Sequence, residues 1–197
     1  MTGPKLILAS ASPRRSELLS QIGVKFEVAA QHIDESPRSN ESPEQLVMRL
    51  SQEKAAAGLA AHAQGSVVIG SDTLVILGET IMGKPEDQAD GQRMLAALSG
   101  AVHKVLTAVT VCDGKNSRTN LSSTRVKFRL ITEAEASEYW QSGEPEGKAG
   151  GYGIQGLGAV FVESIEGSYS GVMGLPLFET AQLLREFGVP CWQPASK

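Results

Sequence analysis

The 197-residue sequence has few of the residues that build common metal and redox sites. It contains two cysteines, Cys112 and Cys191, and three histidines, His32, His62 and His103. There is no CxxC pair or Cys/His cluster, so a structural zinc site is not expected. Cys112 lies in an apolar strand pattern and is expected to be a small core residue. The histidines show no ligand spacing and are expected at the surface or satisfied by hydrogen bonds.

Long apolar runs and an excess of basic residues are also missing. No apolar run approaches the ~20 residues of a membrane-spanning helix, and residues 1–5 do not resemble a signal peptide. The formal net charge is −4, whereas general nucleic-acid-binding proteins are usually basic. We therefore expect a cytoplasmic protein without a membrane or nucleic-acid partner. The motifs G-x-x-x-x-G-K-[ST] and G-x-S-x-G are absent, so the chain is not a P-loop NTPase and has no nucleophile elbow.

Helix and strand patterns mix along the chain, with no internal repeat. This order predicts a mixed α/β sheet with flanking helices. In 123–130, alternation predicts Val126, Phe128 and Leu130 facing inward. The glycine-rich stretch 150–158 is expected to be a functional loop, and the residues beyond Pro190 a loose tail. The expected strands are 5–9, 24–30, 66–77, 101–112, 123–130 and 159–165, and the expected helices are 13–22, 44–61, 87–98, 132–143 and 176–187.

The segment 8–19 predicts a strand, a tight turn and a helix. Ser12 suits the N-cap and Pro13 the first helical position. Arg14 and Arg15 in the first turn oppose the helix dipole, at about 0.3–1 kcal/mol each. A bound phosphate would explain them, because helix N-termini with serine and arginine bind anions. The alternative is a pair of solvated arginines on a surface turn, and this segment alone leaves both interpretations open.

Two more charges lie where apolar residues are expected. Asp72 interrupts the β-branched runs 67–69 and 74–77, which are typical of a strand buried on both faces. A buried carboxylate needs a cation, hydrogen bonds or a metal nearby; alternatively, Gly70–Thr73 is a turn between two hairpin strands. Lys54 continues the apolar face of helix 44–61, and either snorkels outward or points toward an anion.

Basic side chains beside turns or on inward faces are unexpectedly frequent for an acidic protein. Glu35 and Asp72 are candidate ligands of a divalent metal. Cations together with Mg²⁺ held by carboxylates are what a polyphosphate requires. The five cations are Arg14, Arg15, Lys54, Lys84 and Lys148.

Six sequence blocks resemble the Maf family of nucleoside triphosphate pyrophosphatases. The resemblance implies a fold shared with inosine-triphosphate pyrophosphatases, with two lobes around a cleft. It implies one domain over 1–190 with a tail at 191–197, and a homodimer. It also implies hydrolysis of a small-molecule nucleoside triphosphate between its α- and β-phosphates, with Mg²⁺ or Mn²⁺ as cofactor. The blocks are Leu8–Arg15, Gly70–Thr73, Gly83–Pro85, Lys148–Gly156, Gly167–Tyr169 and Val172–Pro176.

The resemblance also assigns roles to individual residues. Asp72 matches the family's proton acceptor, and Glu35 with Asp72 is assigned to the metal. The residues at the base-selecting positions resemble the subgroup that acts on dTTP and UTP rather than the one that acts on 7-methyl-GTP. A glutamine amide there matches the donor–acceptor edge of thymine or uracil. The phosphate-binding positions are Ser10, Arg14, Arg15, Lys54 and Lys84, and the base-selecting positions are Arg14, Thr73 and Gln155.

One departure from the family pattern and one alternative function remain. The family usually has an acidic residue before the lysine of the Lys148–Gly156 block, where this chain has Gly147. If that carboxylate assists the metal, Glu144 or Glu146 is the candidate substitute. The alternative function is a nucleotide-binding regulator of cell division or septum formation with little catalysis. Asp72 favours an enzyme, because a pure binder gains little from an anion beside a triphosphate.

Overall fold

The strands form a mixed sheet, as predicted. The computed structural model describes residues 3–62 and 65–192, and within them a seven-stranded sheet has the order β2-β1-β3-β5-β6-β7, with β4 paired to β3. β1 is parallel to β2 and β3, whereas β3–β4 and β6–β7 are antiparallel. The strands are β1 (Leu6–Leu8), β2 (Glu27–Val28), β3 (Val67–Leu77), β4 (Thr80–Met82), β5 (Val102–Cys112), β6 (Ser117–Phe128) and β7 (Val162–Glu166).

Two of the described helices begin at a capping box. Ser42 and Gln45 form a reciprocal capping box at the start of α2, and Thr132 and Glu135 form another at the start of α4, as their sequence pattern predicts. None of the helices in the described ranges has the length and apolarity of a bilayer span. The helices are α1 (Pro13–Gln21), α2 (Pro43–Ala60), α3 (Gln88–Leu98), α4 (Glu133–Gln141), α5 (Tyr169–Met173) and α6 (Leu177–Glu186), with 3₁₀ turns η1 (Ala149–Gly151) and η2 (Leu157–Phe161).

The chain divides into two compact units. The first contains Met1–Asp72, Thr107–Ser122 and Gly174–Lys197, and the second contains Thr73–Leu106 and Ser123–Met173. β3, β5 and β6 therefore each contribute residues to both units.

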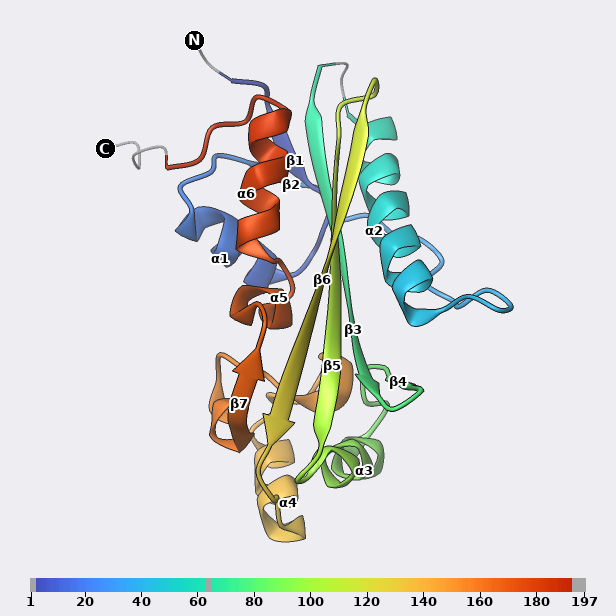
Figure 1. The fold of residues 1–197 in the computed structure, drawn as a ribbon, viewed down its shortest axis with the longest axis vertical. Helices are drawn as coiled ribbons and strands as arrows, with labels where there is room; N and C mark the ends of the chain where they lie inside the picture. The colour runs from blue at the N-terminus through green and yellow to red at the C-terminus, as the bar shows by residue number, and fades with distance from the viewer. Residues whose placement is uncertain (1–2, 63–64, 193–197) are drawn as a thin grey trace. The chain divides into compact units, whose positions relative to one another are not determined.

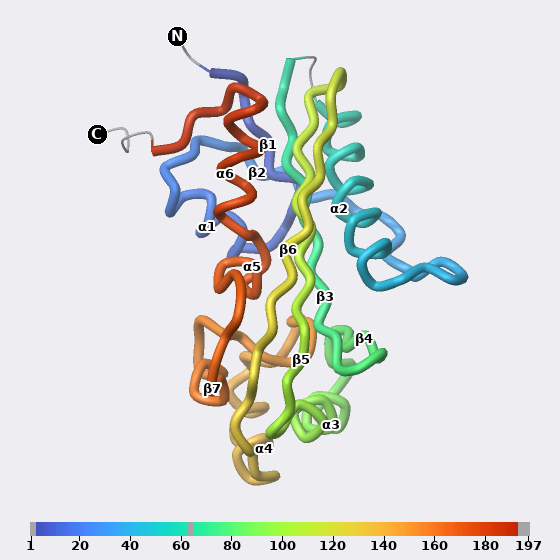
Figure 2. The backbone as a smooth tube through the Cα atoms, in the orientation of Figure 1, coloured from blue at the N-terminus to red at the C-terminus, as the bar shows by residue number. Residues whose placement is uncertain are grey.

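The core of the first unit surrounds β1. All three residues of this strand are buried, as expected for a parallel strand covered on both faces. Ile7, Ala55, Val68 and Cys112 belong to one apolar cluster, which joins β1, α2, β3 and β5 and confirms Cys112 as a core residue. Figure 1 shows α2 on one side of these strands and α1 and α6 on the other. Figure 2 traces β5 and β6 as neighbours connected by a tight turn at 113–116.

The second unit has its own aromatic core. Phe128 is fully buried and belongs to an apolar cluster with Met94, Leu95, Tyr139 and Tyr152. These side chains come from β6, α3, α4 and the loop after η1. α3 packs against α4 and η1 within this unit. The glycine-rich stretch 150–158 therefore packs against helices and contributes Tyr152 to the aromatic core.

Four predictions about the strands need correction. Residues 67–77 form the single strand β3, with Ser71 and Asp72 buried, so the turn interpretation of Gly70–Thr73 is wrong. Leu130 is 78% exposed, not inward, because β6 ends at Phe128 and the alternation ends with it. The strand expected over 24–30 is confined to β2, and the strand expected over 123–130 is longer and begins at Ser117.

The strand expected over 159–165 also differs from the structure. Its first part is the 3₁₀ turn η2, in which the Ala159 N–H donates to the Gly156 carbonyl. Only the following residues pair with β6, as the exposed strand β7. At the C-terminus, the Trp192 N–H donates to the Ile22 carbonyl at 2.7 Å, so this part of the predicted tail is anchored. Residues 193–197 lie outside the described residues.

Glycine allows α2 to approach β3 closely. A Cβ at Gly70 would lie 2.4 Å from the Ser51 carbonyl oxygen and 2.6 Å from the Ala55 nitrogen. Both are backbone atoms of α2, so a side chain at position 70 would force the helix away from the strand. This contact brings the helix that carries Lys54 onto the strand that carries Asp72.

We predict that Gly70→Ala destabilises the protein by about 1–3 kcal/mol or more through overpacking. The free energy of unfolding in urea measures the effect. Gly83→Ala is the matched control, because a Cβ there meets no atom within 4 Å and surface changes usually stay within about ±0.5 kcal/mol. Equal stability of the two variants would contradict this packing argument.

His103 is a buried, neutral member of the second core. It is 1% exposed, its Nε2 lies 2.8 Å from the Tyr152 hydroxyl, and its ring meets the Phe128 ring edge-on at 4.9 Å between centroids. Burial lowers its pKa to about 4. His32 is exposed, and His62 Nδ1 lies 2.7 Å from the Gly58 carbonyl oxygen. His32 therefore lies at the surface, and His62 and His103 each have one ring nitrogen within hydrogen-bond distance of a partner, whereas the buried His103 Nδ1 has no partner in the described part of the chain.

The His103 pKa predicts a loss of stability in mild acid. Between pH 6.5 and 4 the unfolded chain binds a proton that the folded protein excludes, so stability falls as the pH falls through this window. We expect the free energy of unfolding to drop between pH 7.5 and pH 5 by about 2 kcal/mol more in the wild type than in His103→Leu. Urea unfolding at both pH values measures this difference, and His32→Gln should follow the wild type. Parallel pH profiles of the wild type and His103→Leu would refute the assignment.

Candidate active site

Ser10 organises the turn between β1 and α1. Its hydroxyl oxygen is buried and accepts hydrogen bonds from the Ser12 backbone N–H at 3.2 Å and from Arg15 Nη1 at 3.0 Å. Ser12 occupies the N-cap position and Pro13 begins the helix, as predicted, but the Ser12 side chain makes no capping hydrogen bond. Ser10 therefore sets the turn and also contacts the arginine of the first helical turn.

Arg15 is held inside the first unit. Its Nε donates to the Gly174 carbonyl oxygen at 2.8 Å. Burial lowers the pKa of Arg15, while the negative charge of Asp72 acts in the opposite direction and the charge of Arg14 acts with burial. The interpretation of Arg15 as a solvated surface residue is wrong, because it is half-buried and its guanidinium donates to Ser10 and to the Gly174 carbonyl.

Gly174 is a site residue that sequence reasoning missed. Its carbonyl oxygen accepts from Arg15 Nε and, at 3.0 Å, from the Ser71 hydroxyl. The residue has a φ of 121°, which favours glycine. Its place in the Val172–Pro176 block was the available signal, but a backbone acceptor has no signature in the side-chain sequence. Gly174 links the Arg15 helix to the residue that precedes Asp72.

Lys54 lies between two carboxylates. Its Nζ is 2.6 Å from Asp72 Oδ1 and 2.6 Å from Glu35 Oε1. Lys54 is 8% and Asp72 is 6% exposed, so the lysine points inward and does not snorkel. Charges at this depth are tolerated only when they are paired. Glu35 approaches from the segment before α2 and its side chain is about half exposed, which places it at the solvent side of the cluster.

The first unit therefore brings together most of the predicted phosphate and metal residues. Arg14, half-buried, adds a second positive charge beside Arg15. The cluster combines three cations with two carboxylates around one helix N-terminus, which is suitable for binding a polyanion together with a divalent cation. Its members are Ser10, Arg14, Arg15, Glu35, Lys54 and Asp72.

The remaining candidates belong to the second unit. Thr73 is half-buried in β3, Lys84 is exposed after β4, and Gln155 is exposed in the loop after η1. The Gly150 N–H donates to the Gly83 carbonyl at 2.9 Å, so the Lys84 segment and the Lys148–Gly156 block are joined within this unit.

Carboxylate oxygens are the side-chain donors that a divalent cation such as Mg²⁺ prefers. Among residues 3–62 and 65–192, no three His, Cys, Asp or Glu side chains form a group that could hold a metal by themselves. Glu35 and Asp72 provide two carboxylates joined through Lys54. Mg²⁺ is commonly bound by one or two carboxylates plus substrate phosphates. Gly147, at the position where the family has an acid, has a φ of 68°, a conformation that favours glycine.

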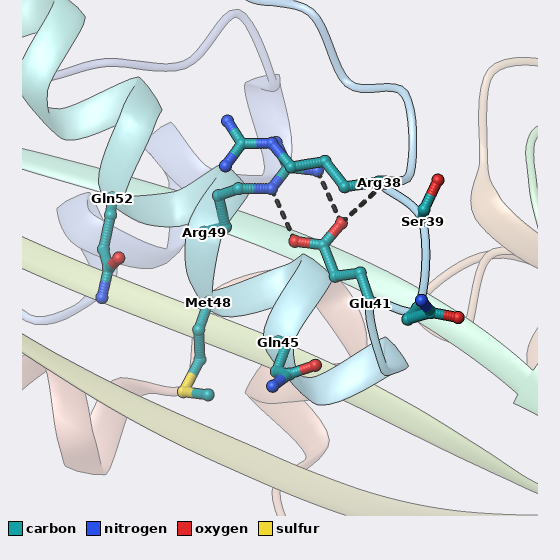
Figure 3. Close-up of a pocket in the computed structure, with 8 residues that line it drawn as sticks. Arg38, Ser39, Glu41, Gln45, Met48, Arg49 and Gln52 are labelled. Atoms are coloured by element: carbon teal, nitrogen blue, oxygen red, sulfur yellow. Dashed lines mark hydrogen bonds and ion pairs between the residues drawn. The ribbon is translucent and has the colours of Figure 1, made fainter.

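A separate surface hollow lies before and along α2. It has a volume of about 430 Å³, and in Figure 3 the Arg49 guanidinium points toward the Glu41 carboxylate. The two groups are 2.6 Å apart, and Arg49 holds the pKa of Glu41 at about 2. None of the candidate site residues lines this hollow, and its main charges neutralise each other. It is lined by Arg38, Ser39, Asn40, Glu41, Gln45, Met48, Arg49 and Gln52.

Comparisons with known proteins show the family of the chain. A family model described as Maf-like protein matches residues 5–187. A dTTP/UTP pyrophosphatase of Saccharophagus degradans is 54% identical over 191 residues, covering 95% of this chain and 91% of that protein. One of Vibrio vulnificus is 52% identical over 183 residues, covering 93% of this chain and 98% of that protein. One of Vibrio cholerae is 52% identical over 187 residues, covering 95% of this chain and 100% of that protein. The resemblance read from the sequence blocks is confirmed, and the chain belongs to the Maf family.

Proposed function

We propose that the protein hydrolyses dTTP and UTP to the nucleoside monophosphate and pyrophosphate. The observation that carries this proposal is the position of Lys54, which is bonded to both Glu35 and Asp72 in the unit that also contains the half-buried Arg15. The relatives named dTTP/UTP pyrophosphatase, which match more than nine-tenths of the chain, support the same activity.

Asp72 is the proposed proton acceptor. One of its oxygens is fixed by Lys54, so the carboxylate has a defined orientation from which to align a water molecule and take its proton. Water then adds to phosphorus, and the anhydride bond between the α- and β-phosphates breaks. The products are the monophosphate and pyrophosphate, and the water proton resides on Asp72 until it is returned to solvent.

The basic residues of the first unit are proposed to bind the triphosphate. An ammonium group has three N–H donors, and Lys54 directs two of them to Asp72 and Glu35. One remains for a phosphate oxygen. Arg15 is preoriented by Ser10 and Gly174, which lowers the entropy cost of binding. Lys84 is assigned to the phosphates through the family resemblance.

Glu35 and Asp72 are proposed to hold a divalent cation, Mg²⁺ or Mn²⁺. When bound, the cation would neutralise charge on the phosphate oxygens. Arg14, Thr73 and Gln155 are proposed to select the base, with the Gln155 amide matching the donor–acceptor edge of thymine or uracil. A homodimer and a cytoplasmic location remain predictions from the sequence.

We expect Asp72→Asn to abolish most turnover while preserving the fold. Asparagine retains the size of the side chain and an oxygen that accepts from Lys54, but it cannot take a proton. Loss of a general base costs about 10²–10⁴-fold in kcat. Pyrophosphate release from dTTP, with and without Mg²⁺, measures the effect, and thermal unfolding checks the fold.

Asp87→Asn is the control for this substitution. Asp87 caps α3 by accepting from the Asp90 N–H, and asparagine caps helices equally well. Full activity of Asp72→Asn would remove Asp72 from the chemistry. A wild-type protein that binds dTTP but releases no pyrophosphate would favour the regulatory alternative.

We expect Gln155→Glu to impair pyrimidine recognition more than metal use. A carboxylate only accepts hydrogen bonds and would repel a carbonyl of uracil or thymine that the amide matches. An unsatisfied polar contact of about 1–3 kcal/mol lowers kcat/KM for UTP and dTTP by about 10–100-fold. The Mg²⁺ concentration for half-maximal activity should change much less. Gln182→Glu, an exposed position on α6, is the control, and equal losses for all nucleotides would show that Gln155 does not contact the base.

A further inference from the structure

The loop that carries Gln155 folds over the side chain of Glu144. The Gly158 N–H donates to Glu144 Oε1 at 2.9 Å, and the Leu157 N–H donates to Oε2 at 2.8 Å. One carboxylate therefore holds two consecutive amides on the C-terminal side of Gln155. Hydrogen bonds of this type are strong because the acceptor is charged.

Tyr139 of α4 holds the other side of the same loop. Its hydroxyl donates to Glu144 Oε1 at 2.7 Å and accepts from the Gly153 N–H at 3.0 Å. The tyrosine is buried, and its ring packs edge-on against Phe161 with centroids 5.0 Å apart. Together, Tyr139 and Glu144 form a clamp that bonds three backbone N–H groups, two residues before Gln155 and two and three residues after it.

The glycines of the loop are explained by the closeness of this clamp. A Cβ at Gly156 would lie 2.1 Å from Glu144 Oε2, and one at Gly158 would lie 2.7 Å from the Tyr139 hydroxyl oxygen. A Cβ at Gly153 would lie 2.9 Å from Glu144 Oε1. Only glycine lets the backbone approach the two side chains so closely. The carboxylate and the glycines therefore fit each other as one built arrangement.

The carboxylate is kept in its accepting form. Burial by itself would raise the pKa of Glu144, but the hydrogen bonds from Gly158, Tyr139 and Leu157 hold it below the usual value. The group is ionised at neutral pH and accepts from all three donors. These bonds occupy both carboxylate oxygens. We therefore assign Glu144 to holding the loop, and not to the metal-assisting role of the acid that the family has where this chain has Gly147.

We infer that Glu144 is a positioning residue for base selection, acting with Tyr139 to fix the loop from which Gln155 reads the pyrimidine. The inference rests on the proposed function, because it assigns to the clamp the orientation of an amide that matches thymine or uracil. A side-chain amide discriminates between bases only when its donor and acceptor are held in place, since a mobile amide can turn to suit either edge.

The test is Glu144→Gln, which keeps the shape of the side chain. Its single oxygen cannot accept at both former positions, and its NH₂ group would face a backbone N–H. We expect exchange of the Leu157 and Gly158 amide hydrogens to accelerate about tenfold or more, and KM for UTP to rise about tenfold. The ratio of kcat/KM for UTP to that for CTP should fall by a similar factor, with kcat for UTP changed less than about threefold.

Two further variants keep the test decisive. Glu138→Gln removes the same charge at an exposed position of α4, and it should leave amide exchange and the UTP/CTP ratio unchanged. Tyr139→Phe keeps the ring packing and removes only the hydroxyl. It should accelerate exchange at Gly153 and lower the UTP/CTP ratio, so the inference is still tested if Glu144→Gln fails to fold.

Three results would overturn the inference. The first is faster amide exchange in Glu144→Gln with an unchanged UTP/CTP ratio, and the second is unchanged exchange at Leu157 and Gly158. The third is a shifted Mg²⁺ requirement without a change in base selection, which would make Glu144 a metal residue. A wild-type protein that hydrolyses none of these nucleotides would overturn the proposed function instead, and amide exchange would still decide whether Glu144 holds the loop.

Discussion

The ammonium group of Lys54 between Asp72 and Glu35 is the interaction on which the candidate site depends. Two carboxylates so close to one another repel, and burial of Asp72 adds a desolvation cost. One lysine pairs with both carboxylates at 2.6 Å, and the positive charge of Arg15 acts on the same two groups. The lysine reaches them only because α2 lies against β3 at Gly70. A packing detail between a helix and a strand therefore determines whether the charges of the first unit can coexist.

Much of this cluster was predictable because its residues violate local patterns. Asp72 interrupts a buried strand, Lys54 occupies an apolar helix face, and Arg15 opposes a helix dipole. Each such residue destabilises the fold when considered alone. It is tolerated where neighbouring groups compensate for that cost in free energy. Leu130 shows the limit of the same reasoning. The alternation of apolar and polar residues in the sequence continues to Leu130, whereas the strand β6 already ends at Phe128.

The contacts that sequence reasoning missed are made by backbone atoms or by ordinary surface-type residues. The Gly174 carbonyl receives Arg15 and Ser71, and nothing in the identity of a glycine reveals where its carbonyl points. Glu144 lies in a stretch that reads as a polar turn, and its partners are the amides of residues thirteen and fourteen positions away. Such pairings depend on how the loop returns to α4, which local propensity does not encode.

The contacts in the two units are of different kinds. The first balances full charges, where strength comes from low exposure and close pairing. The second arranges neutral amides around one carboxylate, where selectivity depends on direction more than on strength. Each set of contacts is complete within its own unit, with Lys54 and Arg15 in one and Glu144 and Tyr139 in the other. Because we propose that Gln155 selects the base, we expect a change at Gln155 or in its clamp to alter the base preference and to leave the Lys54–Asp72 pair intact.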